Sequence, residues 1–294
     1  MILNKRIPIK YWLKLIKWDL LIVTVFSVVM YLFQDYMSRL AIPISVGGFL
    51  GTAIALLLSF KLAQSYDRWW EARKIWGAIV NDSRSLILQV KHFLPAENRV
   101  VLRTIGYRQI AWCYAVCNHL RKLDSHKDVI PMVSEMEWEV LKDHKHIPLA
   151  LMDFTVGDVS ALHKSKQLND YQHVQIDKTL VRLTASLGKA ERIKNTVFPT
   201  TYRVILHFFI YIFLIVLSIP LSELFRFSEI PLLIGISLPF FFLEKIAFTI
   251  QDPFENAPTD TAMREISKNI ERNILQILDE EVPDAVRPDS YYIL

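Results

Sequence analysis

Apolar runs of membrane length alternate along the chain with stretches in which apolar residues recur every three or four positions. A membrane helix needs about 20 largely apolar residues to cross the hydrocarbon layer. The first and second runs form one hairpin within residues 1–60, and the third and fourth form another within residues 199–250. The pattern therefore predicts an all-α membrane protein with four transmembrane helices, at about residues 20–36, 40–60, 203–222 and 230–250.

The second apolar run passes directly into a segment rich in charge and tryptophan, SYDRWWEARKIWG at residues 65–77. No glycine or proline interrupts the chain between Gly51 and Gly77. These two residue types are the ones that most weaken a helix interior. We therefore predict one continuous helix that leaves the membrane and continues into water.

Residues 61–198 contain no apolar run of membrane length, and their apolar positions follow helical spacing, as in Ile75, Trp76 and Ile79. This region is predicted to be a large cytosolic portion made of amphipathic helices. Residues 251–294 are predicted to add a cytosolic helix and tail, with Asp260 as the helix N-cap.

Basic residues predict the orientation, because lysine and arginine concentrate on the cytoplasmic side of membrane helices. Arg39 and Arg226 are the only cations in the two loops that join paired spans. The segment ahead of the first span is far more basic, with Lys5, Arg6, Lys10, Lys14 and Lys17. Both loops are therefore predicted to lie outside and both termini in the cytoplasm.

Catalytic motifs are missing from the sequence. It contains no G-x-S-x-G elbow, P-loop or H-E-x-x-H motif, so we predict neither an enzyme nor a cofactor. Asp143, His144 and His146, with Asp153 nearby, have the residue types of a metal site but no recognised ligand spacing, and no metal site is predicted. The net charge of +4 comes without a long basic block, which argues against a nucleic-acid partner.

Three further residues have polar or reactive side chains in apolar segments. His207 lies inside a predicted span, where a polar group is costly. It is either functional or satisfied by a tyrosine, a backbone carbonyl or a neighbouring subunit. Cys113 and Cys117 are four residues apart, on one helix face and badly placed for a disulfide, so they are predicted to be reduced core thiols.

The second span has two stripes with a spacing of four residues. The small-residue stripe permits close approach of another helix, and it consists of Gly47, Gly51, Ala55 and Ser59. The adjacent stripe consists of Gly48, Thr52, Leu56 and Phe60. Either the second stripe faces a symmetry axis, where Leu56 and Phe60 would form a hydrophobic constriction, or both stripes are buried in an ordinary helical bundle.

Three segments resemble one known family. They are SYDRWWEARKIWGAIVNDSR at 65–84, NTVFPTTY at 195–202 and QDPFENAPTD at 251–260. The chain resembles the bacterial members of the bestrophin ion channels over nearly its whole length. The resemblance implies a homopentamer in the bacterial inner membrane, with one central pore and a hydrophobic neck.

Carried over by position, the resemblance places the neck at Thr52, Leu56 and Phe60. The family's bulky apolar residue is absent at Thr52, which implies a wider and wetter outer end. A second restriction, the cytosolic aperture, is placed at Tyr171, with Leu168 as the alternative.

The resemblance also bears on what passes through the pore. Bacterial relatives tend to conduct monovalent cations and animal relatives conduct chloride, so we expect a cation-leaning channel, with an anion channel as the alternative. The segment at 252–260 has too few carboxylates for the family's calcium clasp, and we expect no calcium activation. A hypothesis of another class is a membrane scaffold or regulatory protein without ion flux. The expected partners are membrane lipids, monovalent ions and further copies of the chain.

Overall fold

The computed structural model describes residues 8–37, 40, 42–196, 199–224, 228–284 and 292. They divide into two compact units, each with its own core. The apolar unit comprises the described residues within 5–69 and 197–252, and the amphipathic unit those within 70–196 and 253–294. Arg39 and Arg226, on which the predicted orientation depends, lie outside the described residues.

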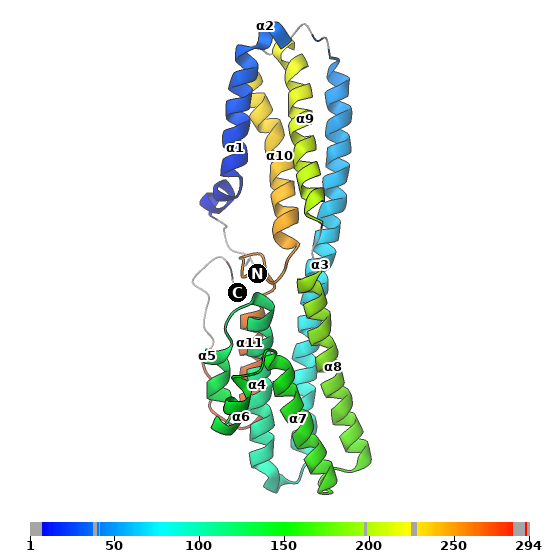
Figure 1. Ribbon diagram of the computed structural model, residues 1–294, viewed down its shortest axis with the longest axis vertical. Coiled ribbons are helices and arrows are strands. Elements are labelled where there is room, and N and C mark those ends of the chain that lie inside the picture. The colour runs from blue at the N-terminus through cyan, green and yellow to red at the C-terminus, as the bar shows by residue number, and fades with distance from the viewer. Residues whose placement is uncertain are drawn as a thin grey trace. The chain divides into compact units, whose positions relative to one another are not determined.

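The apolar unit is built from helices that are long and apolar enough to cross a membrane, and the described residues contain four such helices, as predicted. Helix α10 packs against both α1 and α9 (Figure 1). The core between the helices is almost wholly aliphatic and aromatic, and it includes Val23, Ile54, Leu58, Ile210, Phe213, Leu217 and Phe241. The elements are α1 (Ile9–Leu32), the short α2 (Gln34–Met37), the first part of α3 (Ile44–Phe93), α9 (Thr200–Leu224) and α10 (Glu229–Ile250).

Two helices begin at positions other than those expected. Helix α1 starts at Ile9 and includes the basic segment before the apolar run. Charged side chains do not end a helix, and the first helix-restricting residue upstream is Pro8, at the N-cap. Helix α3 starts at Ile44 rather than at residue 40, because Pro43 disfavours helical geometry in the residue before it.

Helix α3 continues without interruption for 50 residues, which confirms the prediction of one continuous helix. It ends at Phe93, just before Pro95. Its first part supplies Ile54 and Leu58 to the core of the apolar unit. Its second part supplies Trp76 and other side chains to the core of the amphipathic unit.

The amphipathic unit is a bundle centred on α4, which packs against α7 and α11, while α7 packs against α8 (Figure 1). Ile75, Trp76 and Ile79 are buried, as their spacing predicts. Besides the second part of α3, its elements are α4 (Arg99–Arg121), α5 (His126–Val129), α6 (Glu135–Leu141), α7 (Ile147–Lys164), α8 (Asp170–Asn195) and α11 (Met263–Ile277), with 3₁₀ turns at Ala96–Asn98 and Ile130–Met132.

Both cysteines are buried free thiols of α4, as predicted. Burial raises the pKa of the Cys113 thiol to about 12. The thiolate, which is the reactive form, is therefore strongly disfavoured.

The predicted cap of the C-terminal helix is wrong. Helix α11 begins at Met263 without a side-chain cap. Asp260 instead accepts the backbone N–H of Asn256 at 2.6 Å, and Asn256 has a left-handed backbone with φ of 67°. The Asp260 carboxylate thus stabilises the turn before α11 and does not cap the helix.

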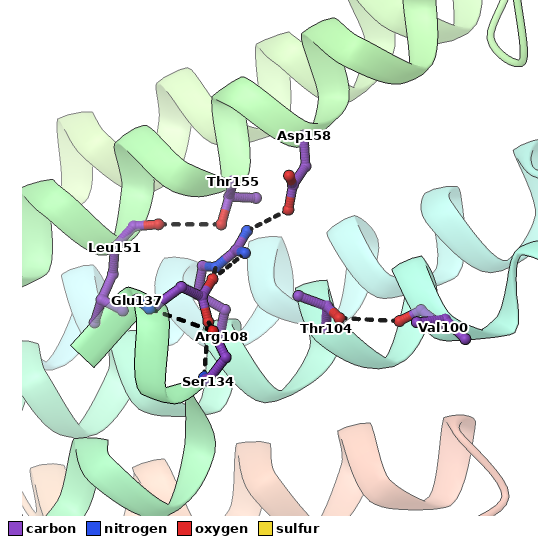
Figure 2. Close-up of polar contacts among 8 residues, drawn as sticks. All are labelled: Val100, Thr104, Arg108, Ser134, Glu137, Leu151, Thr155 and Asp158. Carbon is purple, nitrogen blue, oxygen red and sulfur yellow. Dashed lines mark hydrogen bonds and ion pairs between the residues drawn. The ribbon is translucent and has the colours of Figure 1, made fainter. Parts of the chain in front are cut away.

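A buried arginine joins three helices of the amphipathic unit. Figure 2 shows the Arg108 guanidinium of α4 between Glu137 of α6 and Asp158 of α7. Nη1 donates to Asp158 at 2.7 Å and Nε donates to Glu137 at 3.0 Å. The Arg108 side chain is only 5% exposed, so the two carboxylates offset a charge that is costly to bury.

Glu137 also closes the N-terminus of α6, because its carboxylate accepts the backbone N–H of Ser134 at 2.9 Å. Burial by itself would raise the pKa of Glu137. The hydrogen bonds from Ser134 and Arg108 outweigh this effect and hold the pKa below its ordinary value. The ionised form therefore stabilises the fold above the ordinary glutamate pKa, and this stabilisation is lost as the pH falls.

Arg108→Ala should lower the free energy of unfolding by about 2–3 kcal/mol at pH 7, since it leaves the half-buried Glu137 and Asp158 without their cation and removes a packed side chain. Denaturant unfolding of the purified protein measures the change. The control is Lys142→Ala, which removes an exposed pair with Glu139 and should cost less than about 1 kcal/mol. The difference between wild type and Arg108→Ala should shrink below about pH 4. Equal losses in the two variants would contradict the assignment.

Candidate functional site

One face of α3 is left uncovered in the apolar unit. Leu56 and Phe60 are 56% and 59% exposed, and Thr52 is exposed on the same face. The Thr52 hydroxyl donates to the carbonyl of Gly48 at 2.9 Å, so it is satisfied within the helix. A Cβ atom added at Gly48 would meet nothing within 4 Å. The second stripe is thus open and largely apolar within one chain.

Phe49 adds to this face, although the stripe of four-residue steps omits it. It is 74% exposed, and it precedes Leu56 by seven residues, close to two helical turns. A heptad spacing, in addition to the four-residue spacing, would have found it in the sequence.

The opposite face of α3 packs on α9 through its glycines. A Cβ atom at Gly47 would lie 3.1 Å from Leu217, and one at Gly51 would lie 3.0 Å from the ring of Phe213. Both distances are shorter than ordinary van der Waals contact. The small residues are therefore needed for the close approach of the two helices.

The last two residues of the small-residue stripe do not pack on α9 as the two glycines do. Ala55 and Ser59 are exposed within the chain. Steps of four residues advance about 40° past a full helical turn, so such a stripe drifts around the helix. The buried side chains follow alternating steps of three and four residues instead, through Ile54, Leu58 and Lys61. Within the described part of one chain, Ala55 and Ser59 are therefore not packed against another helix.

Lys61 is a buried cation that the apolar pattern of the sequence did not predict. It is 1% exposed, and its Nζ donates to Gln251 Oε1 at 2.5 Å. Nζ also lies 4.8 Å from the ring centroid of Phe248, and the Arg203 guanidinium lies 5.2 Å from the same ring. Cation–π contacts of this kind lower the cost of removing a cation from water. The spacing of three residues from Leu58 marks Lys61 as part of the buried seam.

His207 is satisfied within its own chain by carboxylates, an alternative that the sequence did not suggest. Its Nδ1 lies 3.0 Å from Glu244 of α10, and its Nε2 lies 3.7 Å from Asp19 of α1. Lys245 completes the cluster at 3.1 Å from Asp19. Asp19 and Glu244 are 5% and 1% exposed. Charged side chains of α1 and α10 and the imidazole of α9 thus meet inside an apolar unit, where unpaired charges would be very costly.

The N-terminus of α8 distinguishes the two candidates for the cytosolic aperture. Tyr171 is 90% exposed, whereas Leu168 is 2% exposed and belongs to the core of the amphipathic unit. Asp170, directly before Tyr171, is 91% exposed and lies 2.8 Å from His163. A capping box between Asn169 and Gln172 fixes the start of the helix. The exposed pair at this helix end is therefore a tyrosine and a carboxylate.

The acidic residues and histidines that lie near one another in the sequence at 143–153 do not form one cluster in the structure. Asp143, His144 and Asp153 are exposed, and only His146 joins a compact group of ligand-type side chains among the described residues. Its partners are His119 and Glu191, which come from distant parts of the sequence.

Comparison with known proteins identifies the family. Residues 12–276 match the model of the family described as bacterial/fungal bestrophin protein. The chain belongs to this family. The assignment made from the motifs at 65–84, 195–202 and 251–260 is thereby confirmed.

Relatives of this bestrophin cover almost the whole chain. A protein named voltage-dependent anion channel-forming protein YneE, from Escherichia coli O157:H7, is 31% identical over 94% of this chain and 91% of its own length. Another, RSc3414 from Ralstonia nicotianae, is named in the same way and is 29% identical over 79% of this chain and 76% of its own. The crystal structure of a bacterial bestrophin homologue from Klebsiella pneumoniae matches with a TM-score of 0.85 at 26% identity, over 90% of this chain and 99% of that one.

Gly51→Leu should lower the free energy of unfolding of this bestrophin by about 1–3 kcal/mol, because the new side chain must displace Phe213. The matched control is Gly48→Leu, which enters open space on the same helix and should raise stability by up to about 1 kcal/mol, the gain in helix propensity over glycine. Both changes raise helix propensity by the same amount, so the difference between their free energies of unfolding measures the packing of residue 51 against α9. Thermal unfolding of the purified variants measures it, and equal midpoints would rule out the close α3–α9 contact.

Proposed function

We propose that the chain is the subunit of a homopentameric ion channel that conducts monovalent ions passively through a central pore. The family membership supports this proposal, as do the four helices able to cross a membrane. The channel is placed in the bacterial inner membrane, in contact with its lipids and with both termini in the cytoplasm. Protease access to terminal tags in inside-out vesicles tests that orientation.

The uncovered face of α3 is the observation that most favours a pore. Leu56 and Phe60 are more than half exposed on a helix whose opposite face is packed on α9. Rings of five such side chains around an axis form a neck that excludes water when narrow, and it gates by dewetting. Thr52 begins this neck, where its smaller side chain leaves a wider outer end. Ala55 and Ser59, exposed in one chain, are assigned to contacts between subunits.

Tyr171 is proposed as the cytosolic aperture in preference to Leu168, whose side chain is buried. The adjacent Asp170 would then give a ring of five carboxylates near the ion path. A ring of this sign attracts cations and repels anions. This favours a cation-leaning channel over the anion channel that the names of the relatives suggest.

Calcium is not expected to activate the channel. The segment at 252–260 offers Asp252, Glu255 and Asp260, too few for the usual six to eight oxygen ligands without other donors. Asp260 already accepts the N–H of Asn256.

Leu56→Ala and Phe60→Ala should each raise the single-channel conductance by about twofold or more in planar bilayers, because a smaller ring leaves a wetter neck. The purified channel used for this experiment should have the mass of a pentamer. Phe208→Ala on α9 is the matched control, since Phe208 is 60% exposed, close to the value for Phe60, and lies outside α3. Unchanged currents in both α3 variants would refute the neck, and liposomes without any ion flux would support the scaffold hypothesis.

The reversal potential in a tenfold potassium chloride gradient should have the sign expected for a cation-permeable pore. Asp170→Asn should lower the cation-to-anion permeability ratio by about twofold or more, since it removes five carboxylates from the aperture. Asp153→Asn, an exposed acid on α7, is the control and should leave the ratio unchanged. A wild-type reversal potential of the opposite sign would establish the anion alternative.

Currents through the channel should be the same with and without micromolar calcium, because the segment at 252–260 offers too few carboxylates for a calcium site.

A further inference from the structure

We propose that His119, His146 and Glu191 form a binding site for a divalent transition metal, for which zinc is the representative ion. The site lies wholly within the amphipathic unit and does not depend on ion conduction. His119 is in the last turn of α4, His146 is the N-cap of α7, and Glu191 lies near the end of α8. The metal would therefore join three helices.

The three side chains already converge. Glu191 Oε1 lies 2.9 Å from His119 Nε2 and 2.7 Å from His146 Nε2, and the three ligand atoms all lie within 4.8 Å of one another. The two imidazole rings are 4.5 Å apart at an angle of 35°. Ligands of a tetrahedral zinc ion lie about 3.3 Å apart when each is about 2.0 Å from the metal. The two distances to Glu191 therefore need to lengthen by about 0.5 Å, and the two imidazole nitrogens, which lie within 4.8 Å of each other, need to settle at about 3.3 Å.

Two imidazoles and one carboxylate form a donor set that zinc accepts, with the remaining position open to water. Here Glu191 accepts hydrogen bonds from both rings, so the carboxylate holds the ligands together before a metal arrives. Such preorganisation lowers the cost of assembling a site. The three side chains remain between 25% and 34% exposed, which allows an ion to enter.

Binding requires both imidazoles to move the ring proton from Nε2 to Nδ1, and at His146 this change also costs a hydrogen bond. Its Nδ1 accepts the backbone N–H of Leu149 at 3.2 Å, which places the ring proton on Nε2. Coordination through Nε2 moves that proton to Nδ1 and ends the capping bond. Loss of a helix cap weakens binding by about tenfold. This loss is small beside the affinity that three zinc ligands supply.

The surroundings limit the affinity. A cavity of about 380 Å³ adjoins the cluster, and its lining includes His119, Glu191, Lys122, Lys145 and Asp124. The cavity leaves room for water on the open coordination position. The lysines oppose a further positive charge, so we expect a dissociation constant of about 1–10 µM.

Zinc titration of the purified full-length protein by calorimetry tests the proposal. One zinc ion should bind per chain, and saturating zinc should raise the unfolding midpoint by about 5 °C. His119→Ala, His146→Ala and Glu191→Gln should each weaken binding by at least about tenfold. The cobalt-loaded protein should show the visible absorption of a tetrahedral site, and His119→Ala should abolish it.

His163→Ala is the matched control, because His163 is paired with a carboxylate at 2.8 Å but belongs to no compact group of three metal-type ligands among the described residues. It should bind zinc like the wild type. The proposal is overturned if the wild type does not bind zinc below about 100 µM. It is also overturned if His163→Ala weakens binding as much as His119→Ala does. Neither result bears on ion conduction, which is measured separately.

Discussion

The seam along α3 is the constraint on which the apolar unit depends. A helix presents one stripe to its neighbours, and here the stripe includes two glycines that let α9 approach closely, followed by Ile54, Leu58 and Lys61. Once this stripe is fixed, helical geometry leaves Leu56 and Phe60 uncovered. The face proposed to line the pore is thus a consequence of where the packing stripe lies. The same helix also supplies Trp76 to the core of the amphipathic unit.

Buried charges are paired across helices in both units. Arg108 is held by two carboxylates from α6 and α7, and the buried Asp19 of α1 is paired with Lys245 of α10. Each pairing offsets a desolvation cost that a single charge would impose. Because the partners come from different helices, each pairing also selects one arrangement of those helices. The polar contacts add specificity to cores that are otherwise aliphatic and aromatic.

The side chains that are proposed to act on ions lie at the ends of helices. Tyr171 and Asp170 begin α8, and Glu191 lies near its other end, beside His119 and His146. The first pair is proposed to act on the permeating ion, and the second group to bind a metal ion. Helix ends suit both roles, because side chains there converge from several elements while the helices keep their packing.

Four features could be predicted from the residues alone: the all-helical class, the four apolar helices, the continuity of α3 and the family. These follow from local periodicity, from helix-restricting residues such as Pro43 and Pro95, and from contiguous motifs. Packing between helices sets the partners of His207, the burial of Lys61 and Leu168, and the exposure of Ala55. It alone brought His119 and His146 to Glu191, which lies 72 and 45 residues away in the sequence. Spacing within one helix cannot encode such contacts, because they depend on which face each helix turns toward another.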